Sequence, residues 1–182
     1  MSSLEEKIIY LSKVKIIALI LGSIIVVVLG AWFLSLDAQS IESSRRFNSP
    51  TLVYGIGIVS IVLFGLSGLF GIKKLFDKSP GLILNSEGIL DNSSGLSAGL
   101  IPWSEVMDIG EYQVQKQKFI SIHVQDPEKY ANNGNALKRM ANRANIKMCG
   151  TPINISANSL KIGYKELLDV IQEYYRSSRS NT

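Results

Sequence analysis

The chain has 182 residues, 46% of them hydrophobic, and its 19 basic and 15 acidic side chains give a net charge of +4 at pH 7. Cys149 is the single cysteine and His123 the single histidine. These counts exclude an intramolecular disulfide, a cysteine-rich metal site and a metal site built on a pair of histidines. With membrane segments present, a positive charge of this size indicates anionic lipid headgroups as partners before nucleic acid, which is not expected to bind.

Two apolar stretches without a charged residue, at 16–36 and 50–72, follow each other in the first half of the chain. A transmembrane helix needs about 20 apolar residues, so each stretch is long enough to cross a bilayer. The sequence predicts a transmembrane hairpin over residues 1–78, with an external loop at 37–49. A cleaved signal peptide is the alternative for the first stretch, but signal cores run to about 7–15 residues and end at a small-residue cleavage site. Leu36-Asp37-Ala38 is a poor match to such a site.

Cations around the two spans predict the orientation of the hairpin. Lysine and arginine are more frequent in cytoplasmic loops than in external ones. The loop between the spans carries Arg45 and Arg46, whereas the outer ends of the spans are flanked by six lysines: Lys7, Lys13, Lys15, Lys73, Lys74 and Lys78. We therefore expect an integral, multi-pass protein with both termini in the cytoplasm.

Small residues are frequent in the second span. Gly65, Gly68 and Gly71 recur at intervals of three and are candidate helix-packing residues, because small side chains let helices approach closely in lipid. They would pack on the first span or form the seam of a homodimer. Transport is disfavoured, because ion pathways usually place charged residues within the membrane.

The remainder, residues 79–182, is expected to form a cytosolic domain of the α+β class. Short apolar runs separated by turn residues predict an antiparallel β-meander with strands at 81–85, 89–92, 98–102, 106–115 and 119–125. A short helical turn at 126–130, an inserted helix at 136–148 and a strand at 153–156 follow. Within the inserted helix, one face is shared by Leu137, Met140, Ala141, Ala144 and Met148. An amphipathic C-terminal helix at 164–176 carries a stripe of Tyr164, Leu167, Leu168, Ile171 and Tyr175.

Three segments of this domain carry a family resemblance: Gly-Ile-Leu-Asp at 88–91, Ile-Pro-Trp-Ser-Glu-Val at 101–106, and Ile-Ser-Ile at 120–122 running into Asp126-Pro127. They resemble bacterial pleckstrin-homology-like (PH-like) domains, in particular an uncharacterised family of small bacterial membrane proteins with two N-terminal spans. The resemblance implies a partly open antiparallel barrel plugged by the C-terminal helix, and a place in the bacterial inner membrane. It does not imply phosphoinositide binding, because the loop at 85–88 is acidic where lipid-binding members place cations.

A few residues are candidates for contacts. The basic residues Lys73, Lys74, Lys78, Arg139, Arg143 and Lys147 would either face an anionic membrane surface or form an ordinary solvated surface. Trp103 is a candidate anchor of the domain, with ligand stacking as the alternative. Cys149 is expected to be a small buried residue and not a nucleophile, because only His123 could activate it.

These patterns predict a membrane-anchored, non-enzymatic module whose cytosolic domain binds a protein partner or the anionic membrane surface. The alternative is a membrane subunit or regulator that forms homo-oligomers through the glycine-rich span. The sequence indicates no catalytic residue, no metal site and no cofactor.

Overall fold

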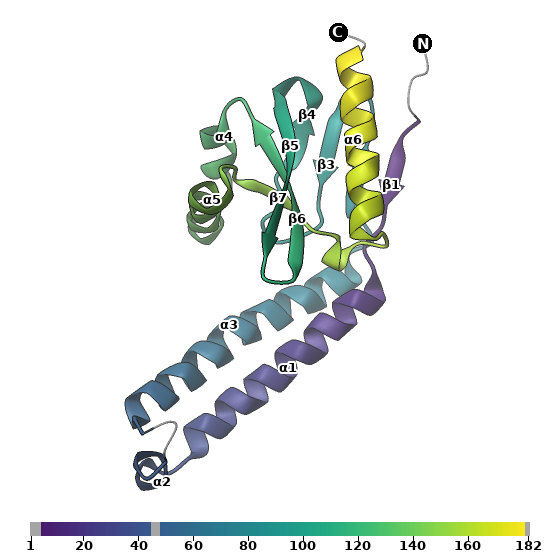
Figure 1. Cartoon of the computed structure of the whole chain (residues 1–182). Helices are drawn as coiled ribbons and strands as arrows, with labels where there is room; N and C mark the ends of the chain where they lie inside the picture. The colour runs from purple at the N-terminus through teal and green to yellow at the C-terminus, as the bar shows by residue number, and fades with distance from the viewer. Residues whose placement is uncertain (1–4, 45–47, 181–182) are drawn as a thin grey trace. The chain divides into compact units, whose positions relative to one another are not determined.

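A computed structural model describes residues 5–44 and 48–180 (Figure 1). Arg45 and Arg46, expected in the external loop, lie outside the described residues. The chain forms two compact units. The hairpin unit is Lys13–Asp77, and the β-sheet unit combines Met1–Ser12 with Lys78–Thr182.

The hairpin unit consists of two long apolar helices packed against each other, α1 (Lys13–Ser35) and α3 (Pro50–Phe76), with the short α2 (Ala38–Glu42) between them. Proline suits the first turn of α3, because its missing N–H would have no helical partner there. The side chain of Asp37 caps α2 by accepting from the backbone N–H of Ser40 at 3.2 Å. Both long helices are long and apolar enough to cross a membrane, and Val14 and Leu69 are 78% and 65% exposed. The expected pair of candidate spans is thus confirmed as a helical hairpin.

A strand that the sequence analysis did not anticipate comes before α1. β1 (Lys7–Ile9) pairs with β2 (Leu82–Leu84), which pairs with β3 (Gly88–Asp91), which pairs with β4 (Gly99–Pro102), all antiparallel. Ile9 is 5% exposed and lies opposite Leu82. The whole hairpin unit is therefore inserted between two neighbouring strands of one sheet. The β-sheet unit accordingly includes the segment before α1, in addition to the expected residues 79–182.

The second sheet contains β5 (Val106–Val114), β6 (Gln117–Val124) and β7 (Ile153–Ile155), in the order β5-β6-β7. A single turn of 3₁₀ helix, η1 (Trp103–Glu105), leads from the first sheet into β5. The turn between β5 and β6 places Gln115 in the left-handed region, with φ of 52°. The predicted strands are confirmed within a few residues, and β6 begins two residues earlier than expected. The described residues form two separate sheets, and closure into a barrel is not shown.

The core of the β-sheet unit lies between the two sheets and α6 (Tyr164–Ser180). Figure 1 shows α6, in yellow, running alongside the strands. Strand alternation directs side chains of both sheets into this core, and α6 adds its apolar stripe. The fully buried side chains of the sheets and α6 are Leu82, Leu84, Ile89, Ile101, Ile120, Ile122, Ile155, Leu167 and Ile171, and Leu160, between η2 and α6, is also fully buried. The buried stripe of α6 includes Val170 and Tyr174, which the sequence analysis omitted. Two further helices, α4 (Pro127–Ala131) and α5 (Ala136–Cys149), connect β6 to β7, and the 3₁₀ turn η2 (Ala157–Ser159) follows β7.

Candidate functional site

The predicted apolar face of α5 points to solvent. Leu137, Met140 and Met148 are 64%, 66% and 58% exposed. The side of the helix that packs on the unit holds a polar residue, Asn142, which is 3% exposed and donates from Nδ2 to the backbone oxygen of Tyr130 at 3.0 Å. The buried Oδ1 of Asn142 has no hydrogen-bond partner among the described residues. The hydrogen bond from Nδ2 favours the observed rotation of the helix, because losing it would leave the buried Nδ2 unpaired, which is costly. The apolar side chains of α5 therefore face solvent.

Cations border this stripe. Arg139, Arg143 and Lys147 recur at intervals of four, so they share one side of the helix, and all three are exposed. Together with Ala136, Met140 and Ala144 they line a shallow hollow on the helix surface. Of the 14 residues of α5, none is acidic. The expected basic surface of α5 is therefore an amphipathic surface, with an apolar stripe beside a row of positive charge.

The other three candidate cations flank the end of α3. Lys73 and Lys74 lie in its last turn, where positive charge favours the helix dipole. The Nζ atom of Lys74 forms an ion pair with Asp77 at 2.9 Å, whereas Lys73 and Lys78 are exposed. Lys73 and Lys74 belong to the hairpin unit, while Lys78 opens the second segment of the β-sheet unit.

Two glycines outside the predicted set lie at a close contact between α1 and α3. A Cβ on Gly57 would lie 2.9 Å from the backbone oxygen of Gly30, and a Cβ on Gly30 would lie 2.9 Å from the backbone oxygen of Gly57. Gly71 also faces α1, with Ile20 2.9 Å from its would-be Cβ. Gly68 makes only an ordinary contact of 3.5 Å with Ser23, and Gly65 has no atom of the described chain within 4 Å.

Trp103 lies at the junction of the two sheets. It is 6% exposed, and its Nε1 donates to the backbone oxygen of Asn85 at 2.8 Å. Its ring centroid lies 6.3 Å from that of Tyr175 on α6. These contacts tie η1 to the β2–β3 turn and to the C-terminal helix, which fits the expected role of a domain anchor.

A small polar cluster joins η1 to α4. Glu105 accepts from the Nζ of Lys129 at 2.6 Å and from the hydroxyl of Tyr130 at 2.8 Å. The hydrogen bond from Lys129 lowers the pKa of Glu105 below its ordinary value of 4.5, with a further contribution from Tyr130. Burial and the hydrogen bond to Glu105 raise the pKa of the Tyr130 hydroxyl well above 10.0. The cluster holds η1 and α4 together, since Glu105 accepts hydrogen bonds from both other side chains.

The single thiol and the single imidazole are not linked by any hydrogen bond within the described part of the chain. Cys149 Sγ lies 3.1 Å from the backbone oxygen of Asn145 and 3.2 Å from Nδ2 of Asn154, so it is part of a local hydrogen-bonded group. Over residues 5–44 and 48–180, no group of three or more His, Cys, Asp or Glu side chains is placed to hold a metal ion.

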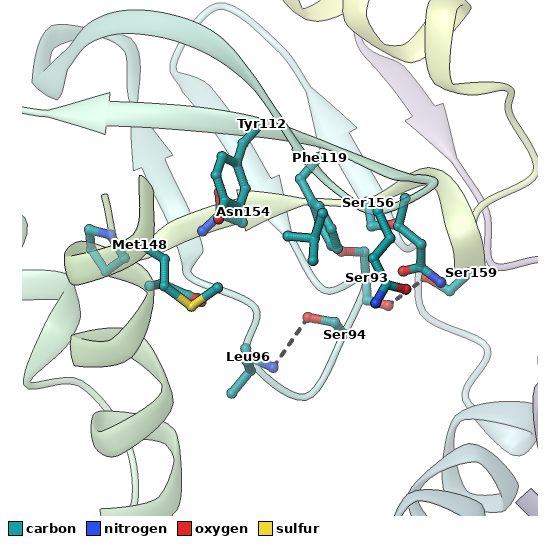
Figure 2. A pocket seen from close by; sticks show the side chains of 14 residues that line it. Ser93, Ser94, Leu96, Tyr112, Phe119, Met148, Asn154, Ser156 and Ser159 are labelled. Carbon is teal, nitrogen blue, oxygen red and sulfur yellow. Dashed lines mark hydrogen bonds between the residues drawn. The ribbon is translucent and has the colours of Figure 1, made fainter. Parts of the chain in front are cut away.

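A groove of about 480 Å³ lies on the face of the β5-β6-β7 sheet that points away from the core (Figure 2). The paired residues Tyr112 and Phe119 lie on neighbouring strands beneath it. Asn145 and Met148 of α5 form one wall, and the loop between β3 and β4, which includes Leu96, forms the other. This groove could not be predicted from the sequence, because its lining comes from separate parts of the chain: the β3–β4 loop, β5, β6, α5 and the segment around β7 and η2.

No family model, no curated protein and no solved structure matches the chain.

Proposed function

We propose that the protein is a membrane-anchored, non-enzymatic module whose β-sheet unit is PH-like and binds the anionic membrane surface through α5. The α1–α3 hairpin supplies the anchor. Sheets of four and three antiparallel strands followed by a C-terminal helix support the PH-like assignment, which the sequence resemblance first suggested. In this assignment, the membrane hairpin occupies the connection between the first and second strands.

The pairing of β1 with β2 supports an orientation in which both ends of the hairpin lie on the same side of the membrane. These strands lie on opposite sides of the hairpin in the sequence, and hydrogen-bonded strands occupy one compartment. The flanking lysines favour the cytoplasmic side, and hence a location in the bacterial inner membrane with both termini inside.

The observation that carries the proposal is the exposed stripe of Leu137, Met140 and Met148 beside three cations. A surface of this composition binds at the headgroup boundary, with apolar side chains entering the lipid and cations meeting anionic headgroups. Each cation near an anionic surface contributes about 1 kcal/mol, and full burial of a leucine or methionine side chain contributes about 1.5–3 kcal/mol. The hairpin keeps the helix close to the bilayer, so even a weak interaction becomes highly occupied.

An experiment on the full chain in lipid nanodiscs tests this proposal. An environment-sensitive fluorophore is attached to Met140→Cys in a Cys149→Ser background. Its emission should shift to the blue in nanodiscs that contain anionic lipid, relative to zwitterionic nanodiscs, and the shift should diminish in high salt. Replacing Arg139, Arg143 and Lys147 with glutamine should remove about 3 kcal/mol and with it most of the shift.

Met107→Cys provides the matched control. Met107 is 57% exposed on β5, close to the 66% of Met140, and it lies outside α5. A fluorophore there should give the same emission in both lipids. Equal emission at position 140 in the two lipids, or an equal shift at both positions, would contradict membrane binding through α5.

The alternative of a homo-oligomerising subunit has less support. Gly30, Gly57 and Gly71 are used in the contact between α1 and α3 within one chain. Gly65 remains as the one predicted packing glycine with open space around it among the described residues.

A further inference from the structure

The groove on the outer face of the β5-β6-β7 sheet has the composition of a binding site for a neutral molecule. None of the described residues that line it is Asp, Glu, Lys, Arg or His. A charged ligand would lose hydration there without gaining a counter-charge, which is strongly unfavourable. Its volume of about 480 Å³ falls within the range of about 300–1,000 Å³ that is typical of small-molecule sites.

Apolar and hydrogen-bonding groups converge in the groove. Tyr112 and Phe119 present aromatic surface, and Leu96 and Met148 add aliphatic surface to the lining (Figure 2). Leu96 and Met148 are 41% and 58% exposed, so the groove is open to solvent. Among the described residues, no hydrogen bond engages the Tyr112 hydroxyl or the side-chain amide of Asn145. Such a mixture of apolar walls and a few polar groups both binds and orients a ligand.

A buried carboxylate holds one wall in place. Asp91 is 4% exposed, and its Oδ1 accepts from the backbone N–H of Ser93 at 2.9 Å and from the Ser93 hydroxyl at 2.6 Å. Its Oδ2 accepts from the backbone N–H of Ala98 at 3.2 Å. These bonds close the loop between β3 and β4 on itself.

The same loop is also tied to its surroundings at both ends. The hydroxyl of Ser159 donates to the backbone oxygen of Ser93 at 2.8 Å. The Nζ of Lys138 on α5 donates to the backbone oxygen of Ser97 at 2.7 Å, which links the two walls of the groove. A groove fixed in this way needs little ordering when a ligand enters, and preorganisation of this kind favours affinity.

We propose that this groove binds an uncharged small molecule that has an aromatic or aliphatic body and at least one hydrogen-bonding group. The ligand body packs between the aromatic pair and Met148, while the Tyr112 hydroxyl and the Asn145 amide bind its polar group. This site shares Met148 with the exposed stripe of α5, but Leu137, Met140 and the three cations do not line it, and ligand binding does not depend on membrane binding by that helix.

Methionine-methyl NMR of the full chain in zwitterionic nanodiscs tests the proposal. The probe is N-acetyl-L-phenylalaninamide, which is uncharged and carries one aromatic ring and two amides. It should shift the methyl resonance of Met148 saturably, while the resonances of Met107 and Met140, which do not line the groove, stay in place. At a pH of about 5.5, its anionic analogue, N-acetyl-L-phenylalanine, and its cationic analogue, L-phenylalaninamide, whose amine is fully charged there, should each bind at least about tenfold more weakly.

Two variants test the polar contacts. Tyr112→Phe and Asn145→Ala should each weaken binding of the neutral probe about three- to tenfold, the amount expected for one hydrogen bond. Tyr10→Phe removes the hydroxyl of a half-exposed tyrosine outside the groove and should leave binding unchanged. An unchanged methyl spectrum without probe establishes that each variant is folded.

Several results would overturn the assignment. These are a Met148 resonance that does not saturate up to the solubility limit, equal shifts at Met107 and Met148, or equal binding of the charged analogues. Binding of an uncharged peptide of several residues, without binding of the single-residue probe, would replace the small molecule with a protein segment and overturn it as well. None of these outcomes depends on the lipid composition, so they are distinguishable from failure of the α5 proposal.

Discussion

Replacing Gly57 with alanine should weaken the packing of α3 on α1. The new Cβ would lie 2.9 Å from the backbone oxygen of Gly30, closer than a carbon atom normally approaches an oxygen, and a backbone atom has little freedom to move aside. Forcing extra atoms into a packed contact costs about 1–3 kcal/mol. Alanine also favours the helix over glycine by up to about 1 kcal/mol, which offsets part of this loss.

Gly55→Ala isolates the contribution of the close contact. Gly55 lies two residues away on the same helix and has no atom of the described chain within 4 Å of its would-be Cβ, so alanine there changes helix propensity alone. The packing of α3 on α1 should therefore be less stable in Gly57→Ala than in Gly55→Ala, by about 1–3 kcal/mol.

SDS titration of the full chain in mixed micelles measures this difference. Fluorophores at Leu21→Cys and Leu66→Cys, which are 56% and 59% exposed on the two helices, report separation through energy transfer in a Cys149→Ser background. Gly57→Ala should separate at a lower SDS fraction than Gly55→Ala. Separation of both variants at the same SDS fraction would refute the close contact at Gly57.

Three further predictions concern the β-sheet unit. Ile9→Ala should destabilise it by about 2–4 kcal/mol in chemical denaturation, because Ile9 is buried in the sheet core; a midpoint equal to that of the unaltered chain would show that β1 is dispensable. Trp103→Phe should cost about 1–3 kcal/mol by leaving the backbone oxygen of Asn85 without its donor, measured by the same titration, and an unchanged midpoint would argue against the anchor role. Glu105→Gln should lower stability near pH 7, where the carboxylate is bound by Lys129. Because the pKa of Glu105 is lowered on folding, its contribution is complete above 4.5 and disappears as the pH falls through the folded pKa, so the two chains should converge in acid; a constant difference down to pH 2 would contradict this.

The sequence predicted most elements of the fold but missed β1. The strands after α3 are separated by turn residues, so each could be located from local signals. β1 has only three residues, sits directly before a long apolar helix and pairs with a strand more than 70 positions later. The local sequence of such a segment does not differ from that of the charged residues that usually flank a membrane span.

The surface of α5 could be predicted only in part. The apolar and basic residues of α5 do lie on the sides of the helix that their spacing predicts. The usual expectation that the apolar side of a helix faces the core fails for α5. Asn142 takes the buried side because it finds a hydrogen-bond partner in Tyr130, which lies in a different helix. The groove escaped prediction for a related reason, since its polar and apolar groups meet only after the loop around Asp91, the β5-β6-β7 sheet and α5 have assembled.

The insertion of the hairpin between β1 and β2 has a consequence for biosynthesis. At about 5–20 residues per second, β2 leaves the ribosome roughly 4–15 s after β1. During that interval β1 has no neighbouring strand, and both long helices of the hairpin emerge. In the proposed membrane-anchored arrangement, the first sheet cannot be completed until α1 and α3 have brought their outer ends back to one side of the bilayer. In that arrangement, completion of the sheet is a checkpoint for correct membrane insertion. A chain with only one helix inserted would leave one edge of β2 unpaired and expose the apolar core that β1 normally covers.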